Sequence, residues 1–406
     1  MEARGKLVYG LYRAATRMAS PLMYALVQWR RLRGLEHPSR WPERFGHPSS
    51  PRPPGPLLWF HAVSLGEGLM AIPVIKHCVR QHPDFHVLMT TTTISAFEVI
   101  KDQLPDGVIY QLSPLDSPTI VDKILGYWKP IAVFLMESEL WPNLVISAAN
   151  EGSTLQAVRF QLLNASPNVI HFAGDLKYAV GDFNVLGKDA MKINDLQLQL
   201  TNRPVWIAAS IHEGEEKVML WVHKELIMSY PDLVMILVTR HPQHGQRLAL
   251  ALNKQGLNVS LRSRRDKISS STSVYVVDTL GELRTLYRFT KIAVIGGSFL
   301  PGLAGHNVSE AAAAGCAVLT GPHVGHFSHM LAKMSLAASS SVLQVGNKFE
   351  LLEALKKLLS DANFLDACCM ASKHAFSIVS NGVVERVWEL VDTIVLEKAK
   401  GRLEEH

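Results

Sequence analysis

The sequence predicts two α/β domains, each built on a doubly wound parallel sheet with helices on both faces. The chain has 406 residues, which exceeds what one hydrophobic core usually supports, so two domains are expected. Hydrophobic residues make up 48% of the chain, as in globular proteins and unlike disordered ones. Apolar runs of strand length alternate with helix-like stretches in two separate series, and this alternation is typical of parallel sheets.

The first series begins after a proline-rich linker at residues 49–56, where the prolines offer no backbone donors. Its strand candidates are Leu57–Val63, His86–Thr92, Val108–Leu112 and Ile131–Leu135, with helices expected at Leu69–Gln81 and Ser95–Gln103. The strand candidates of the second series are Val205–Ala209, Val234–Val238, Ser273–Val277, Ile292–Ile295 and Ala317–Thr320. Its helices are expected at Gly214–Met228, Gly281–Phe289, Val308–Gly315, Lys348–Leu359 and Asn363–Ser377.

This pattern divides the chain into three parts. We expect residues 1–50 to form an N-terminal membrane-association or targeting segment, and residues 51–184 to form a first Rossmann-like domain that is incomplete. Residues 185–406 are expected to form a second one that includes the terminal helices. In such domains ligands bind outside the carboxyl ends of the strands, so we expect these ends to line a cleft.

The net charge of +5 is too weak to indicate nucleic acid as a partner. The cysteines form no CxxC pair, and their spacing suits neither zinc nor a disulfide framework. They are Cys78, Cys316, Cys368 and Cys369. We expect buried free thiols and a reducing compartment.

The N-terminus combines apolar residues with arginines. The stretch from Leu7 to Trp29 is apolar but contains Arg13 and Arg17 and is split by Pro21, so it is not a clean spanning helix. A basic cluster follows it, made of Arg30, Arg31, Arg33, Arg40 and Arg44. Three interpretations are open: an interfacial membrane anchor facing anionic lipid, an organelle transit peptide, or an ordinary helix that packs on the first domain.

The segment Trp59–Gly68 places a carboxylate just beyond the end of the first strand. A Ser-Leu-Gly turn follows Val63, and a helix is expected to begin near Glu67. A carboxylate in this position can act as the general base toward a hydroxyl group. The alternative is that Glu67 only complements the dipole of the helix.

A second acidic segment, Met136–Asn143, follows the strand candidate Ile131–Leu135. Glu137 and Glu139 would be costly to bury without partners, which favours a place in the cleft. Alternatively, Ser138 and Glu139 cap the following helix.

The strongest indication of a nucleotide site is a glycine-rich loop after Ile292–Ile295. It runs from Gly296 and Gly297 through Ser298 to the residues His306, Asn307, Val308, Ser309 and Glu310. Backbone amides at the start of the next helix can bind phosphate, and Glu310 can accept hydrogen bonds from ribose. The segment matches neither a Walker loop nor GxGxxG, so a generic glycine turn is the alternative.

Two further strand ends of the second domain carry polar groups. The residues Arg240, His241 and Pro242 follow Val234–Val238, and the arginine can pair with a phosphate or simply cap the strand at the surface. Leu280, Gly281 and Glu282 begin a helix after another strand and can frame a base or a phosphate. The run 212–216 (His-Glu-Gly-Glu-Glu) lacks the second histidine of HExxH, so it is expected to start a helix, and no metal site is predicted.

Together these segments resemble the transferases of 3-deoxy-D-manno-octulosonic acid (Kdo), and the sequence around Thr154–Phe183 is closest to plant members. The resemblance covers nearly the whole chain in order, through the segments Arg40–Gly46, His61–Glu67, Thr90–Thr93, Glu137–Asn143, Gly174–Lys177, Ser210–Glu216, Arg240–Pro242, Asp278–Leu283, Gly296–Glu310 and Gly321–His323. It implies the GT-B glycosyltransferase fold, with two Rossmann-like doubly wound domains. It further implies transfer of Kdo with inversion from CMP-Kdo to a lipid A precursor (lipid IVA), with release of CMP.

The resemblance also implies roles for individual residues. Glu67 corresponds to the catalytic base, and Glu137 and Lys177 correspond to residues that stabilise the transition state. Positions that bind CMP correspond to Arg240, His241, Leu280, Gly281, Glu282, Asn307, Val308, Ser309 and Glu310, to which we add the motif neighbours Pro242, Ser298 and His306. The implied domain roles are acceptor binding for residues 51–184 and CMP-sugar binding for residues 185–406, with the membrane surface as a partner and no cofactor, metal or nucleic acid.

The sequence departs from the family pattern after Asn143, where residues 148–155 run almost directly from one element to the next. About 30 residues, the size of a βαβ unit, are missing there, and their loss would expose an apolar sheet edge. Two alternatives stay open: a catalytically impaired form that binds the nucleotide sugar, and a sugar-nucleotide epimerase or hydrolase on the same fold. The plant-like sequence and the arginine-rich start favour a mitochondrial, membrane-associated location, with the cytoplasmic face of a bacterial inner membrane as the alternative.

Overall fold

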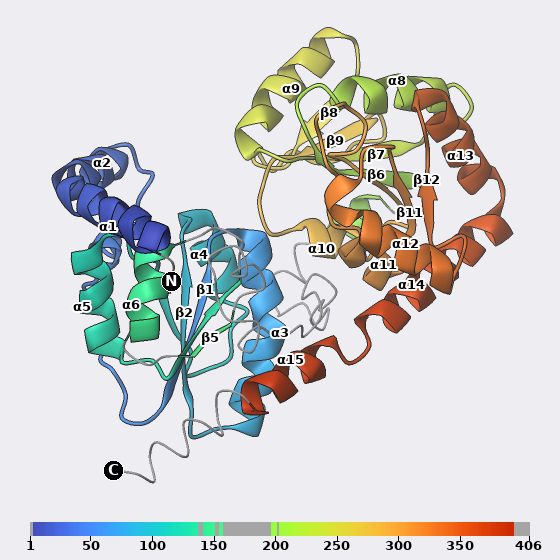
Figure 1. Cartoon of the computed structure of the whole chain (residues 1–406). Coiled ribbons are helices and arrows are strands. Elements are labelled where there is room, and N and C mark those ends of the chain that lie inside the picture. Colours follow the sequence, from blue (N-terminus) through green and yellow to red (C-terminus); the bar gives the residue numbers. More distant parts are fainter. Residues whose placement is uncertain (1–2, 137–140, 151–153, 157–195, 201–202, 394–406) are drawn as a thin grey trace. The chain divides into compact units, whose positions relative to one another are not determined.

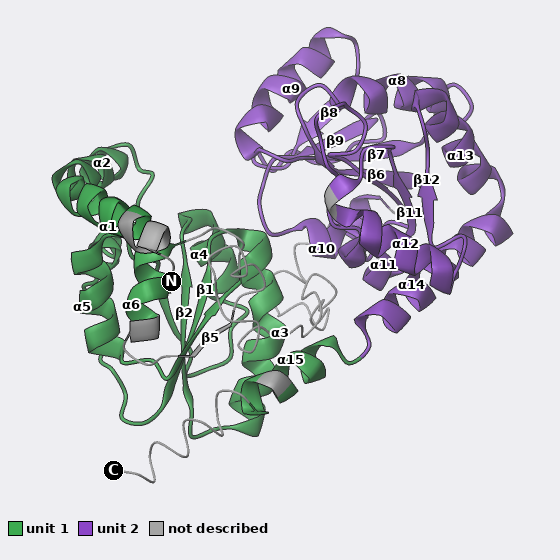
Figure 2. Cartoon of the chain, viewed as in Figure 1, with its two compact units in different colours: residues 1–181, 382–406 green, residues 182–381 purple. Residues whose placement is uncertain are grey.

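The computed structural model divides the chain into two compact α/β units (Figure 2). Unit 1 comprises Met1–Gly181 and Gly382–His406, and unit 2 comprises Asp182–Asn381. The structure describes all residues except 1–2, 137–140, 151–153, 157–195, 201–202 and 394–406. The boundary at Gly181 lies close to the one expected from the sequence at residue 184.

Unit 1 is built on a five-stranded parallel sheet with the strand order β3-β2-β1-β4-β5 (Figure 1). Its strands are β1 (Leu57–Ala62), β2 (His86–Thr91), β3 (Ile109–Leu112), β4 (Ala132–Leu135) and β5 (Thr154–Gln156). Its helices include α3 (Leu65–Gln81), α4 (Ile94–Ile100), α5 (Pro118–Trp128) and α6 (Pro142–Asn150). Every residue of β1 is buried, because helices cover both faces of a parallel sheet.

The two faces of β1 contribute to separate cores. Leu58 and Phe60 pack with α3 and α4, whereas Leu57 and Trp59 pack with α5 and α6. Strands buried on both faces show as continuous apolar runs in a sequence, and this is why β1, β2 and β4 were predicted correctly. The expectation of an exposed edge after Asn143 is not met at β4, because the three-residue strand β5 pairs with it.

The last described helix departs from the predicted division of the chain. We expected residues 185–406 to form the second domain, but α15 (Val383–Val391) belongs to unit 1. Its residues Val387, Trp388 and Val391 are buried in the same core as α3, and the ring of Trp388 lies 5.4 Å from that of His82. The apolar periodicity of such a segment predicts a helix but does not indicate which sheet the helix covers.

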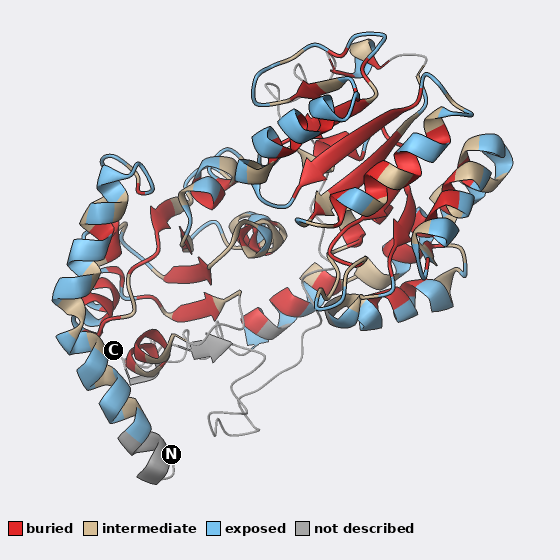
Figure 3. Cartoon of the chain, turned by 90° about the horizontal axis from the view of Figure 1, so that it is seen from above, coloured by how far each residue is buried: buried red, intermediate tan, exposed pale blue. Residues whose placement is uncertain are grey.

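Unit 2 contains a seven-stranded parallel sheet with the order β12-β11-β10-β6-β7-β9-β8. Its strands are β6 (Val205–Ile211), β7 (Val234–Thr239), β8 (Val259–Leu261), β9 (Val274–Val277), β10 (Ile292–Ile295), β11 (Ala317–Thr320) and β12 (Val342–Gln344). Its helices include α8 (Glu216–Ile227), α9 (Pro242–Lys254), α10 (Leu283–Leu286), α11 (Ser309–Ala314), α12 (Ser328–Ala337), α13 (Lys348–Ser360) and α14 (Ala362–Ser380). Figure 3 shows the strands of the sheet as mostly buried, whereas the helices that cover it carry both buried and exposed residues.

All nine strand candidates are confirmed, with ends that differ by at most two residues. The structure adds three strands of only three residues each, β5, β8 and β12. The helix expected at Gly281–Phe289 is a single turn, α10, and the helix expected from Val308 begins at Ser309. The positive φ of 83° at Gly281 keeps this residue out of the helix, which therefore begins after it.

The N-terminal residues form two helices, α1 (Ala3–Met18) and α2 (Ser20–Leu32), with Pro21 in the first turn of the second. They are attached to unit 1, because the Tyr12 hydroxyl donates to Asp116 at 2.9 Å and Asn143 donates to Thr16 at 3.1 Å. Their other side carries exposed apolar residues, and the helix beside the N mark in Figure 3 is mostly exposed. Among the described helices, none is long and apolar enough to cross a membrane.

The segment that follows α2 is held to the sheet by buried charges. In the single-turn helix η1 (Trp41–Phe45), Glu43 accepts a hydrogen bond of 2.6 Å from the backbone of Leu112, at the end of β3. Arg44 pairs with Glu36 at 3.2 Å and donates to the carbonyl groups of Thr92 and Ser113. This part of the family resemblance therefore has a structural role, because it fixes the segment after α2 to the carboxyl ends of β2 and β3.

Candidate active site

The chain order of unit 1 reverses at β1, which has β2 on one side and β4 on the other. Ligands of open α/β sheets bind at such a switch point, outside the carboxyl ends of the strands. β1 leads there into the turn that precedes α3. The predicted base Glu67 is therefore at the position where a doubly wound sheet accepts its ligand.

Glu67 is the third residue of α3 and forms a capping box with Ser64. Its Oε2 atom accepts hydrogen bonds from the backbone of Val63 at 3.1 Å and of Ser64 at 2.8 Å. The side chain is only partly buried. The structural interpretation of Glu67 as a residue that complements the helix start is thus confirmed, while its action as a base stays a prediction.

His61, near the end of β1, is a polar residue to which the sequence assigned no role of its own. It is 1% exposed, and its Nδ1 atom lies 2.8 Å from the hydroxyl oxygen of Thr90. Its Nε2 atom is buried and has no hydrogen-bond partner within the described residues. Burial lowers the pKa of His61 to about 4 despite the nearby Glu67, so the ring is neutral at pH 7. The ring of Trp141 meets it edge-on at 4.8 Å.

The predicted residues Glu137 and Lys177 lie outside the described residues, as do Ser138 and Glu139. Asn143, at the end of the same acidic segment, is fully buried. It donates to the carbonyl group of Asp116 at 2.8 Å and therefore anchors α6 to the start of α5.

The switch point of unit 2 lies between β6 and β10, and the buried carboxylate of Glu215 joins the two strand ends. It accepts four backbone hydrogen bonds of 2.8 to 2.9 Å, from His212, Gly297, Ser298 and Phe299. Its exposed fraction is 0%. The expected helix start at 212–216 is confirmed, since α8 begins at Glu216. Three of the four hydrogen bonds of Glu215, however, hold the glycine-rich loop.

Close packing explains the glycines of this loop. A Cβ atom on Gly296 would lie 2.8 Å from the carbonyl oxygen of Ser210, and one on Gly297 would lie 2.6 Å from the ring of His306. Gly297 also has a positive φ of 70°, which favours glycine. Ser298 is fully buried, donates to Ile295 and accepts from Gly321 at 2.8 Å. Its hydroxyl group therefore shapes the loop and has both hydrogen bonds within the protein.

A cluster of histidines lies beside this loop. The Nε2 atoms of His212 and His306 are 2.8 Å apart, and the ring of His241 meets that of His212 edge-on at 6.0 Å. Burial, together with the positive charge of Arg240 and the nearby histidines, lowers the pKa of His306 to about 4. Arg240 is exposed at the end of β7, where a ligand can reach it, and Pro242 begins α9.

The remaining predicted residues surround the same edge of the sheet. Glu282 pairs with Arg262 at 2.7 Å, and Glu310 pairs with Arg284 at 2.7 Å. The sequence alone indicated no role for either arginine. Leu280 is exposed, whereas Val308 is buried in the core. Asn307 accepts a hydrogen bond from the backbone of Ser309 at 2.9 Å. Because α11 has only six residues, its dipole contributes little positive potential at a bound phosphate. We therefore expect cationic side chains to supply much of the positive potential there.

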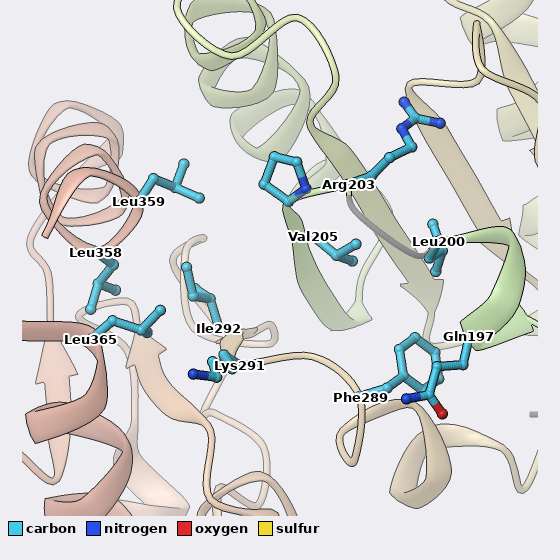
Figure 4. A pocket seen from close by; sticks show the side chains of 11 residues that line it. Gln197, Leu200, Arg203, Val205, Phe289, Lys291, Ile292, Leu358, Leu359 and Leu365 are labelled. Carbon is cyan, nitrogen blue, oxygen red and sulfur yellow. The ribbon is translucent and has the colours of Figure 1, made fainter. Parts of the chain in front are cut away.

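Two recesses lie outside these strand ends. In unit 2, a cavity of about 450 Å³ opens at the amino ends of β6 and β10, opposite to the histidine cluster. Figure 4 shows that leucine side chains line it together with Arg203 and Lys291. In unit 1, a recess of about 380 Å³ lies between α2 and α4 and is lined by residues such as Arg31, His37 and Ile94. The second recess adjoins the C-terminal end of α2.

The cysteines are free thiols, as predicted, and three of them are buried. Burial raises the pKa values of Cys78 and Cys316 to about 12, which makes these thiols unreactive. Within the described ranges, no group of three or more His, Cys, Asp or Glu side chains has the arrangement of metal ligands. The absence of a metal or cofactor from the reaction stays a prediction.

Residues 39–158 match the family described as 3-deoxy-D-manno-octulosonic-acid transferase (kdotransferase). The chain is 50% identical over 442 residues to the probable 3-deoxy-D-manno-octulosonic acid transferase, mitochondrial, of Arabidopsis thaliana, covering 98% of this chain and 99% of the relative. It is 28% identical to the 3-deoxy-D-manno-octulosonic acid transferase of Haemophilus influenzae, covering 94% and 97%.

Solved structures agree on the fold. A glycosyltransferase from Rickettsia africae superimposes with a TM-score of 0.56 at 10% identity, covering 84% of this chain and 99% of that one. A putative UDP-N-acetylglucosamine 2-epimerase from Listeria monocytogenes gives 0.55 at 11% identity, covering 84% and 97%. Both units thus have the Rossmann-like architecture of GT-B proteins. The identity to the Arabidopsis relative over nearly the full length of both chains shows that this chain belongs to the Kdo transferase family and is a glycosyltransferase.

Proposed function

We propose that this chain transfers Kdo from CMP-Kdo to a lipid A precursor such as lipid IVA, with inversion at the anomeric carbon and release of CMP. The observation that carries the proposal is the 50% identity to a probable Kdo transferase over 98% of the chain. The candidate residues that the structure describes support it, because they gather at the carboxyl edges of the two sheets, where doubly wound proteins bind ligands.

Unit 2 is assigned the nucleotide. Its switch point offers the exposed guanidinium group of Arg240 and the glycine-rich loop that Glu215 holds in place. A guanidinium group can form two parallel hydrogen bonds with a phosphate. We assign Arg240 to the phosphate of CMP, where it stabilises the charge that develops as CMP leaves.

Unit 1 is assigned the acceptor, with Glu67 as the general base. The two backbone hydrogen bonds of Glu67 fall on Oε2, and we assign Oε1 to the hydroxyl group of the acceptor sugar. Glu67 takes the proton of this hydroxyl group while the oxygen attacks the anomeric carbon of Kdo, and the bond to the CMP phosphate breaks. No metal or cofactor takes part in this scheme.

The helices α1 and α2 are assigned to the membrane surface that carries the acceptor. Met18, Leu22 and Leu32 are 81%, 74% and 87% exposed, and arginines lie on the same helices. An exposed apolar face with flanking cations suits binding at the interface of an anionic bilayer. The name of the Arabidopsis relative supports a mitochondrial location.

The reaction is tested by incubating the chain with freshly generated CMP-Kdo and a tetra-acylated lipid A precursor, followed by mass spectrometry. We expect a product heavier by one or more Kdo residues. The Arg240→Gln variant is expected to raise the KM for CMP-Kdo by tenfold or more, because a hydrogen bond to a charged group contributes about 1.5–3 kcal/mol. Free Kdo in the absence of acceptor would instead indicate a hydrolase.

A catalytically impaired, nucleotide-sugar-binding form is the second candidate. The alignment with the Arabidopsis relative spans 442 residues, whereas this chain has 406, so the relative carries sequence that this chain lacks. A folded chain that binds CMP but yields neither glycolipid nor free Kdo would favour this candidate over the transferase.

Membrane binding is tested with the variant Leu22→Glu/Leu26→Glu. Both leucines are exposed, so the fold should tolerate the change, while loss of two apolar side chains should weaken vesicle binding at least about tenfold. Cosedimentation with vesicles of phosphatidylcholine, with and without an anionic phospholipid, measures the effect. The matched control replaces the exposed Leu336 and Met370 of unit 2 with glutamate. Equal binding of both variants would contradict the assignment.

A further inference from the structure

Two imidazole rings meet edge to edge at the switch point of unit 2. The Nε2 atoms of His212 and His306 are 2.8 Å apart, while the ring planes differ by 10° and the ring centroids lie 4.9 Å apart. Parallel rings stacked one above the other could not bring these atoms so close without overlap. The rings therefore lie side by side in one plane, which is the geometry of an N–H···N hydrogen bond.

This geometry limits the pair to one proton between the two rings. If both Nε2 atoms carried a proton, two N–H groups would face each other, and if neither did, two lone pairs would. In the neutral pair one ring donates from Nε2 and the other accepts. One further proton, taken up at Nδ1 of the donor ring, makes the shared hydrogen bond charge-assisted and stronger. A second further proton would have to bind Nε2 of the acceptor ring, and the two Nε2–H groups would then face each other.

The surroundings favour the neutral form of the unliganded pair. Burial lowers the pKa of His306 to about 4 and also lowers that of His212. The groups that act on the pair come from each loop packed against it: Glu215 after β6 favours the charged form, whereas Arg240 and His241 after β7 oppose it. An anion bound by Arg240 would offset the positive charge that opposes protonation.

We propose that the His212–His306 pair takes up about one proton when the phosphate group of the nucleotide binds beside Arg240. The charged pair then faces the phosphate as a second cationic group, with Nδ1–H donors on both rings. Close packing holds His306 in this position. Its ring lies against Gly297, where an added Cβ atom would lie 2.6 Å from the ring. This inference rests on the proposed function, since it needs the nucleotide in unit 2.

Isothermal titration calorimetry with CMP measures the proton uptake directly. At pH 6.5, binding enthalpies in two buffers of different ionisation enthalpy give the number of protons taken up by the complex. The comparison is between the wild-type chain, the His212→Asn variant and the His374→Asn control, whose histidine is exposed on α14. The titration of CMP itself is common to all three, so differences report on the protein.

We expect the wild-type chain and the control to take up about one proton more than His212→Asn. Accordingly, the ratio of wild-type to variant affinity should rise by up to about tenfold for each pH unit lowered. If His212→Asn does not fold, His306→Asn removes the same shared hydrogen bond. Equal proton uptake with CMP bound would overturn the inference alone, whereas a folded wild-type chain that does not bind CMP would overturn the proposed nucleotide site as well.

Discussion

The Glu67→Gln variant is expected to transfer Kdo at least about a hundredfold more slowly while it keeps its fold, because a positioned general base raises the reaction rate about 10²- to 10⁴-fold. The amide oxygen of glutamine can still accept the hydrogen bonds from Val63 and Ser64 that Glu67 accepts now. Glutamine is also compatible with a capping box. The change thus removes the proton acceptor and retains the cap.

The measurement is the turnover rate at saturating CMP-Kdo, together with the affinity for CMP. We expect kcat to fall and the affinity for CMP to stay within about twofold, because Glu67 belongs to unit 1 and the nucleotide is assigned to unit 2. Glu385→Gln, an exposed position on α15, is the matched control. Full turnover of Glu67→Gln would remove Glu67 from the mechanism and leave only its role in capping α3.

The strands were predictable because burial on both faces produces continuous apolar runs, as in β1 and β7. The short strands β8 and β12 carry too few residues for such a signal. The position of α15 could not be predicted either, because its apolar side chains would fit any apolar surface. Its contact with α3 joins residues some 300 positions apart, and the sequence pattern carries no information on such pairs.

In the candidate site, too, the sequence predicted features that depend on neighbouring residues but not those that depend on residues far apart in the chain. Glu67 and Arg240 were predicted from their places just after strands, which is a local signal. The role of Glu215 in holding the glycine-rich loop was missed, because three of its four partners lie 82 to 84 residues away. Its own surroundings in the sequence resemble a helix start rich in carboxylates. The pairing of His212 with His306 spans 94 residues and likewise emerges only from the folded sheet.

The Glu215→Gln variant is expected to destabilise unit 2 by about 3 kcal/mol, since each buried donor left without an acceptor costs about 1–3 kcal/mol. Oε1 of Glu215 accepts from Ser298 and Phe299, and Oε2 accepts from His212 and Gly297. An amide has only one oxygen, so either orientation places its NH₂ group against two backbone donors. The variant therefore keeps the size of the side chain but leaves two backbone amides without an acceptor.

Glu216→Gln is the matched control for this change. Glu216 is also buried, but a single backbone hydrogen bond, from Gly214 at 2.6 Å, falls on its Oε2 atom. An amide can rotate to present its oxygen to one donor, so we expect a loss below about 1 kcal/mol. Denaturant unfolding followed by hydrogen exchange separates the two variants, because only Glu215→Gln should expose the amides of Gly297, Ser298 and Phe299 to exchange.

The consequence for ligand binding follows from the same hydrogen bonds. Glu215 sets the distance between the end of β6, which carries His212, and the loop that supports His306. When the loop is released, the histidine pair loses its fixed position beside Arg240. We therefore expect the affinity of Glu215→Gln for CMP to fall at least tenfold, beyond what partial unfolding explains. If CMP binding and amide protection both persisted, the carboxylate of Glu215 would only belong to the start of α8. The shape of the glycine-rich loop would then depend on the hydrogen bond between Ser298 and Gly321 and not on Glu215.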